Sequence, residues 1–154
     1  MDSPSPRSKR KGDSLCNRDR KISAAVTTAP GAYVIAIKLA ELVVVTFAGR
    51  PPIPLPAGRY LYCGSARGPG GLKARISRHM RRGKAVRWHV DQLTERGIII
   101  DGWVFPGGDE CDLVQMLSHL PVPIPGFGSS DCATCRSHLL SWPNGVALPF
   151  NQVG

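Results

Sequence analysis

The chain has 154 residues, 42% of them hydrophobic, which suits one globular domain with a modest core. No apolar run approaches the roughly 20 residues that a membrane span needs, and the N-terminus lacks a signal-peptide core, so we expect neither a membrane partner nor secretion. The formal net charge of +9 favours an acidic partner such as nucleic acid. Five cysteines, an odd number, predict reduced thiols in a cytoplasmic protein rather than a disulfide framework.

The positive charge is concentrated in two segments. Residues 1–27 are rich in Ser, Pro, Lys and Arg with little hydrophobic pattern, and they predict a disordered basic arm. Residues 59–96 hold ten Lys or Arg against two acidic residues. This block predicts a surface for nucleic acid, with DNA favoured and a nucleoid location if the source is bacterial or archaeal. A merely solvated surface is the alternative.

The hydrophobic pattern predicts the secondary structure in chain order. Apolar runs at residues 33–39 and 42–47, two residues apart, predict a β-hairpin, whereas four prolines within residues 49–56 argue against regular structure. Residues 59–63, which include two tyrosines, predict a third strand. The later predicted elements are helices at 72–82 and 86–96, a strand at 98–105, a helix from an N-cap at Asp109 to about 120, a loop at 121–130 and a short helix or turn at 132–142.

These elements predict an α+β fold, with a small antiparallel sheet flanked by helices. They divide the chain into the arm at 1–27, a folded domain at 28–142 and a C-terminal tail at 143–154. No internal repeat interrupts this single-domain organisation.

The helix at 72–82 follows a loop with four glycines and presents two different faces. Leu72, Ile76 and Met80 recur every four residues and form its inward stripe. Arg75, His79 and Arg82 lie on a neighbouring face, where we expect a cationic ridge. The unpaired N–H groups at the start of this helix predict an anion site.

Short motifs in a fixed order carry a resemblance to a known family. They are Gly31-Ala32-Tyr33, then Tyr62-Cys63-Gly64, then Arg75 in a basic helix and Glu110. They resemble the GIY-YIG nuclease superfamily, with GAY in place of GIY and YCG in place of YIG. The surrounding strings, from about residue 31 to about 140, look like a branch of small stand-alone domains within it. The resemblance implies a central three-stranded antiparallel sheet and a metal-dependent endonuclease.

The resemblance also implies roles for individual side chains. Arg75 would clamp the scissile phosphate with its planar fork, and Glu110 would hold Mg²⁺ or Mn²⁺. Tyr33 and Tyr62 would position or deprotonate the attacking water, and His79 would contact phosphate or assist proton transfer. From their patterns alone, Arg75 is one surface arginine among many and the tyrosines are packing residues. Glu110 is equally well explained as an acid at a helix N-terminus.

A wider set of residues would seat the nucleic-acid backbone in this interpretation. His89 belongs to the string Trp88-His89-Val90-Asp91, where it forms either a structural pair with Asp91 or a rim of the site. The expected substrate-binding residues are Gly64, Ser65, Gly70, Gly71, Lys73, Arg78, Arg82 and His89. Action on DNA would be structure-directed, in repair by analogy.

A second constellation predicts a different metal. Cys132, Cys135 and His138 stand at spacings that suit Zn²⁺, although a structural site wants four ligands and only three are local. Cys111 or His119 would complete such a site. Buried thiols with His138 capping a turn are the alternative, and a zinc-stabilised interaction protein is the function that this constellation would support.

One departure from the superfamily pattern leaves a further function open. Many of its nucleases carry an asparagine late in the domain, whereas Asn144 and Asn151 match no motif. A non-catalytic nucleic-acid-binding module with the same fold is therefore the alternative to an endonuclease.

Overall fold

The computed structural model describes residues 27–128 and 135–150, which form three helices and six strands in two antiparallel sheets. The four-stranded sheet has the order β5-β1-β4-β6, and β2 and β3 form the other sheet. The elements are β1 (Gly31–Leu39), β2 (Val43–Phe47), β3 (Arg50–Leu55), β4 (Gly58–Ala66), α2 (Gly71–Met80), α3 (Asp91–Arg96), β5 (Ile98–Pro106), α4 (Glu110–Met116) and β6 (Leu139–Ser141). The predicted α+β class is confirmed, and the main sheet has four strands rather than the three expected.

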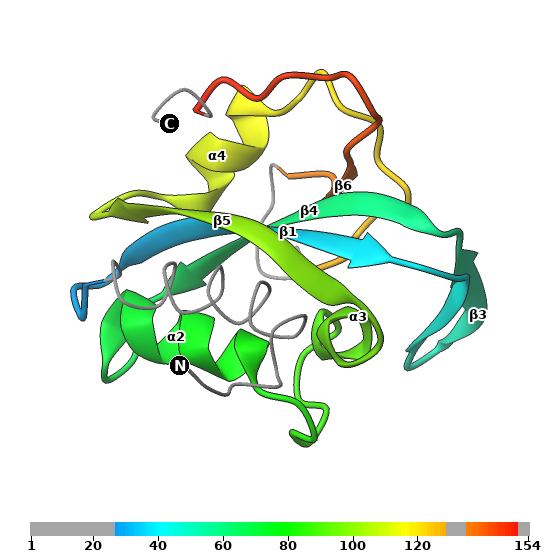
Figure 1. The fold of residues 1–154 in the computed structure, drawn as a ribbon, viewed down its shortest axis with the longest axis horizontal. Coiled ribbons are helices and arrows are strands. Elements are labelled where there is room, and N and C mark those ends of the chain that lie inside the picture. The colour runs from blue at the N-terminus through cyan, green and yellow to red at the C-terminus, as the bar shows by residue number, and fades with distance from the viewer. Residues whose placement is uncertain (1–26, 129–134, 151–154) are drawn as a thin grey trace, which may run out of the picture.

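Helices cover both faces of the main sheet. Figure 1 shows α2 and α3 on one face and α4 on the other. Strand β1 lies between β4 and β5, and its residues 31–37 are all buried. Because successive side chains of a strand point to opposite faces, Tyr33, Ile35 and Ile37 enter the core with Leu72 and Ile76 of α2. Ala32, Val34 and Ala36 enter a second core with Leu113 and Leu117 of α4.

The predicted hairpin of the first two strands is wrong. Strand β1 pairs with β4 and β5, whereas β2 pairs with β3, where the prolines argue against regular structure. Strand β3 is an edge strand, and an edge tolerates proline because a missing N–H on its outer side breaks no ladder bond. Gly49, with φ of 77°, turns the chain between the two strands.

Two of the predicted helices are shorter in the structure. The second helix begins at Asp91, not near residue 86, because Asp91 accepts hydrogen bonds from the backbone N–H groups of Arg87 and Trp88 and closes a turn there. The third helix begins as predicted, with Asp109 accepting from the N–H of Cys111, but it ends at Met116.

The C-terminal part of the described chain belongs to the folded domain. The predicted helix or turn at 132–142 contains strand β6, which pairs with β4, while residues 132–134 lie outside the described residues. In the segment expected as a tail, Leu148 is buried and the Phe150 ring lies 5.1 Å from that of Trp103. The second core therefore extends to Phe150. No helix in the described part of the chain is long and apolar enough to cross a membrane.

Candidate active site

Tyr33 occupies the centre of the candidate site, on β1 directly opposite Gly64 of β4. Its side chain is 1% exposed, and its hydroxyl oxygen lies 2.6 Å from Nε2 of His79. A Cβ atom on Gly64 would lie 2.4 Å from that hydroxyl oxygen, closer than real contacts allow. The glycine of the YCG motif therefore makes room for the tyrosine ring of the GAY motif.

His79 turns from α2 into the core, so the expected cationic ridge with Arg75 and Arg82 is wrong. Only 1% of its surface is exposed, and burial, followed by the charge of Arg75, lowers its pKa to about 3. Its Nδ1 atom is buried with no hydrogen-bond partner among the described residues. His79 is thus a neutral imidazole at neutral pH, hydrogen-bonded through Nε2 to the Tyr33 hydroxyl.

Tyr62 lies beside this pair and is more accessible. Its ring centroid is 6.4 Å from that of Tyr33 and 6.1 Å from that of His79. Burial, and then the negative charge of Glu110, raises the pKa of Tyr62 well above its usual value. The pKa of Tyr33 is also raised, chiefly by burial and then by Tyr62, so both phenols are protonated at neutral pH.

Arg75 projects from the same helix as His79 and is half-buried. Its Nη1 donates to the backbone carbonyl of Ser65 at 2.7 Å. Its guanidinium lies 4.4 Å from the ring centroid of Trp88, which also carries the guanidinium of Arg78 at 4.2 Å. The positive charge of Arg75 acts to lower the pKa of Tyr33 against the larger effect of burial. Arg75 thus supplies the tyrosine cluster with a cation that Ser65 and Trp88 hold in place.

Glu110, the first residue of α4, lies close enough to Tyr62 for its negative charge to raise the pKa of that tyrosine. Its Oε2 lies 3.2 Å from Nδ1 of His138. A hydrogen bond from His138, opposed by burial and assisted by the side chain of Ser65, lowers the pKa of Glu110, which is therefore ionised at neutral pH. Ser65 joins the two charged groups, since its carbonyl binds Arg75 and its side chain binds Glu110.

The predicted anion site at the start of α2 is wrong. The N–H groups that begin the helix already donate to carbonyl groups of the preceding chain. The donors Gly71, Leu72, Lys73 and Ala74 bind the carbonyl oxygens of Gly68, Ala29, Thr27 and Gly70, in that order. Gly71 has φ of +58°, and a Cβ atom there would lie 1.9 Å from the carbonyl oxygen of Thr28. Of the two glycines expected to seat a phosphate, Gly71 instead lets the chain before β1 pack against the helix, and Gly70, with φ of 83°, turns the chain into the helix.

Three of the other expected substrate contacts already have structural partners. Arg78 binds both oxygens of Asp91, at 2.8 and 3.0 Å, so Asp91 pairs with Arg78 and not with His89. Arg82 donates to the carbonyls of Glu95 and Gly97 at the end of α3. His89 packs against Phe47, with ring centroids 4.6 Å apart. Lys73 is exposed near the start of α2.

Asn144 does not join the tyrosine cluster. It lines a hollow of about 740 Å³ with Arg59 and Tyr60, at the opposite end of β4 from Ser65. Asn151 and Cys132 lie outside the described residues. Sequence patterns carry no indication of Trp88 as a platform for two arginines or of Ser65 as a link between Arg75 and Glu110, because both contacts join separate segments of the chain.

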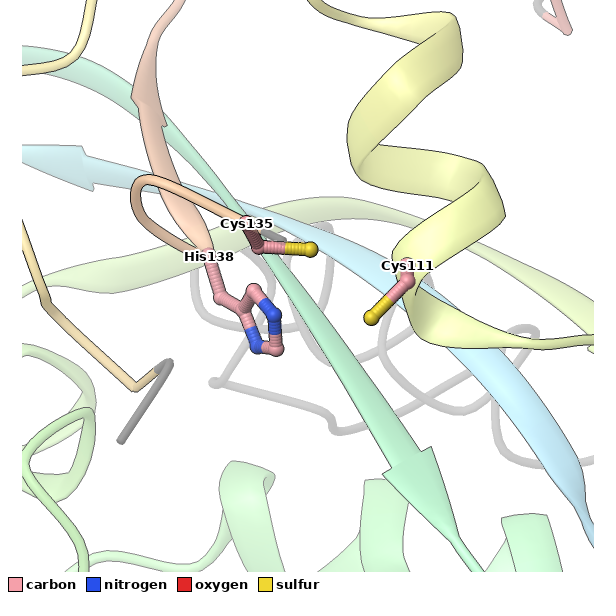
Figure 2. A group of neighbouring side chains, drawn as sticks. All are labelled: Cys111, Cys135 and His138. Carbon is pink, nitrogen blue, oxygen red and sulfur yellow. The ribbon is translucent and has the colours of Figure 1, made fainter. Parts of the chain in front are cut away.

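Two of the three residues expected to bind zinc lie in the described part of the chain, and the fold brings them together with a third residue. Cys135 and His138 lie with Cys111 of α4 in one group, shown in Figure 2. Cys111 is one of the two completing ligands that the sequence suggests. The other, His119, is exposed and is not a member of this group.

The fold and the site define an α+β domain whose sheet presents a buried tyrosine–histidine pair beside an arginine and a glutamate. Residues 32–150 match the model of the domain of unknown function DUF123, and the chain belongs to this family. Searches of curated proteins and of solved structures gave no match.

Proposed function

We propose that this domain is an endonuclease of the GIY-YIG type, which hydrolyses phosphodiester bonds in DNA with the help of Mg²⁺ or Mn²⁺. The observation that carries the proposal is the grouping of Tyr33, Tyr62, Arg75 and Glu110 around one end of β4. These residues stand on two strands and two helices that are separate in the sequence, and they are the same residues that the GIY-YIG resemblance assigns to one site. Packing alone does not require an ionised carboxylate beside two phenols.

The donor set fits a hard divalent cation. Glu110 is ionised at neutral pH because its pKa is lowered, and its two oxygens offer more acceptor positions than His138 and Ser65 occupy. Mg²⁺ often takes only one or two protein carboxylates and completes its shell with water and phosphate oxygens. Bound there, the ion would supply Lewis-acid stabilisation of the phosphate.

The side chains of this chain would divide the remaining tasks. Arg75 would bind a phosphate oxygen with its guanidinium, which the Ser65 carbonyl and the Trp88 ring hold in orientation. Tyr62, the more accessible phenol, would orient the attacking water. The neutral His79 would hold the Tyr33 hydroxyl in one orientation through their 2.6 Å hydrogen bond.

The burial of Tyr33 favours a second candidate function. At 1% exposure its hydroxyl does not meet solvent, and its raised pKa opposes deprotonation. A non-catalytic module that binds nucleic acid and keeps the tyrosine–histidine pair for stability would have the same features. Cleavage assays separate this module from an endonuclease.

The test is metal-dependent cleavage by the full chain. Purified protein would be incubated with Mg²⁺ or Mn²⁺ and labelled single-stranded, duplex, nicked, flapped and branched DNA, with matching RNA. We expect cleavage that falls by about 100-fold or more in Arg75→Ala and Glu110→Gln, the scale found for removing one stabilising group. The exposed Glu41→Gln, on the loop after β1, should cleave like wild type.

A matched pair of glycine variants tests the tyrosine cluster without changing a polar group. Gly64→Ala forces the Tyr33 ring to move, whereas a Cβ atom on Gly68 would meet no atom within 4 Å. We expect cleavage to fall in Gly64→Ala and to persist in Gly68→Ala. Absence of cleavage by wild type on every substrate, with salt-sensitive binding retained, would replace the endonuclease with the non-catalytic module.

A further inference from the structure

Two thiols and an imidazole from distant parts of the chain converge beside the candidate active site. One ligand atom from each of Cys111, Cys135 and His138 lies within 4.8 Å of the others. Figure 2 shows the sulfur of Cys111 directed from α4 toward the segment before β6, where Cys135 and His138 face it. His138 is buried, and the two cysteines are half-buried. The group belongs to the tertiary structure and not to a single turn.

We propose that Cys111, Cys135 and His138 bind a zinc ion. Thiolate sulfur and imidazole nitrogen are the ligands that Zn²⁺ prefers, and zinc–ligand bond lengths set tetrahedral ligand atoms about 3.5–3.8 Å apart. Side-chain rotations that move the ligand atoms by about 1 Å would therefore close the group on the ion. This ligand set differs from the sequence-based one, because Cys111 of α4 takes part and Cys132 is not required.

The surroundings of His138 resemble those of a metal-bound histidine. Its Nδ1 lies 3.2 Å from Oε2 of Glu110. A metal-ligating histidine commonly directs its second nitrogen to a carboxylate, which fixes the ring and strengthens the ligand. Glu110 in that role assigns Nε2 of His138 to the zinc ion. Glu110 and Cys111 are neighbours at the start of α4, so the ion and the carboxylate would hold the ring from two sides.

An adjacent pocket gives the ion a path and room for a fourth ligand. The pocket has a volume of about 500 Å³, and Cys111, Cys135 and Ser137 are among its lining residues. A water molecule from this pocket would complete a tetrahedral site with three protein ligands. The ion would join α4 to the segment before β6, and binding that closes such a long connection stabilises the folded state.

The test uses metal alone and does not depend on nuclease activity. The full chain, purified under reducing conditions, would be stripped of metal and titrated with Co²⁺ and then Zn²⁺. We expect one equivalent of Co²⁺, with the visible absorption of a tetrahedral thiolate site, displaced by one equivalent of Zn²⁺. The sulfur-to-cobalt charge-transfer intensity should correspond to two thiolates, which is measurable on wild type whether or not any variant folds.

Two variants and a matched control identify the ligands. Cys111→Ser should weaken zinc binding by at least about tenfold, since even losing an outer partner of a metal ligand costs that much. Glu110→Gln should weaken binding and leave the cobalt spectrum that of two thiolates. Cys16→Ser, in the segment outside the described residues, should bind zinc like wild type.

Three results would overturn the proposal. The first is the absence of a thiolate–cobalt band in reduced wild type. The second is full zinc retention by folded Cys111→Ser, which would return the site to Cys132, Cys135 and His138. The third is a Cys111–Cys135 disulfide in protein isolated without reductant from cytoplasmic expression, detected by mass spectrometry.

Discussion

At the scale of single residues, the environment of a side chain decides its chemistry. His79 lies in a basic stretch of sequence, yet it is neutral because α2 directs it into the core against Tyr33. Glu110 is half-buried at the start of α4, yet it stays charged because His138 and Ser65 bind it. Gly64 has no side chain, and its contribution is the space that the Tyr33 ring fills. None of these three properties belongs to the residue type alone.

The neutral His79 makes stability depend on pH. Its folded pKa of about 3 lies below the usual value of 6.5, so the unfolded chain binds a proton that the folded chain does not between these values. The free energy of unfolding therefore falls as pH falls through this window. We expect His79 to contribute a loss of about 2 kcal/mol between pH 7 and 5.

Urea unfolding at several pH values measures this loss, and His79→Gln should remove it. Carboxylates with lowered pKa, such as Asp91 at about 2, lose their stabilising effect only at more acidic pH, so pH 5 is a suitable lower limit. NMR titration of the His79 ring gives a direct check. A ring that becomes protonated between pH 7 and 5 in the folded protein would contradict the prediction.

At the scale of elements, α2 is held in place at both ends. The chain at residues 27–29 binds the N–H groups at its start, and Arg78 near its end binds Asp91 at the start of α3. Asp91 is fully buried and also accepts from the N–H groups of Arg87 and Trp88. These contacts fix the helix that carries both Arg75 and His79, so they position the candidate site without belonging to it.

Breaking the Arg78–Asp91 pair should destabilise the domain. Asp91→Asn leaves the Arg78 guanidinium, 15% exposed, without its counter-charge, and we expect the free energy of unfolding to fall by about 3 kcal/mol. Urea unfolding at pH 7 measures the change. The exposed Asp112→Asn on α4 is the control, with an expected change within about 0.5 kcal/mol. Equal stability of the two variants would show that the pair contributes nothing.

At the scale of the whole molecule, the basic block at residues 59–96 offers fewer cations to nucleic acid than its residue count suggests. Five of its ten Lys and Arg side chains already contact other parts of the domain. These contacts join Arg59 to Trp142, Arg75 to Trp88, Arg78 to Asp91, Arg82 to the end of α3 and Lys84 to Glu95. The exposed remainder includes Arg67 and Lys73, which lie on either side of the first residue of α2 in the sequence. Beyond Arg75, the proposed phosphate ligand, a nucleic-acid surface would depend on this remainder.

The salt dependence of DNA binding tests this division of charge. The dissociation constant of a labelled duplex, measured by fluorescence anisotropy over a range of NaCl concentrations, gives the number of phosphate contacts. We expect Lys73→Gln to reduce the slope of log affinity against log salt by about 1, and Arg67→Gln to do the same. Lys38→Gln, exposed near the opposite end of the sheet, should leave the slope unchanged.

The parts of the fold that follow from local pattern are predictable from the sequence. The amphipathic stripe of α2 and the N-cap at Asp109 depend on neighbours within a turn or two. Strand partners and helix ends are predicted poorly, because pairing β1 with β4 and β5, and β2 with β3, depends on which distant apolar faces meet. The turn before Asp91 likewise requires a side chain whose bonds to the backbone outweigh helical propensity.

The sequence by itself determined the α+β class, the core-facing stripe of α2, the basic character and the choice of Tyr33, Tyr62, Arg75 and Glu110 as candidates. Only the tertiary structure decided that His79 meets Tyr33, that Arg78 and Arg82 hold α3, and that Cys111 joins Cys135 and His138. The physical reason is that periodicity along a chain records which side of an element is buried. The partner buried against that side is chosen by long-range packing, which local sequence does not encode.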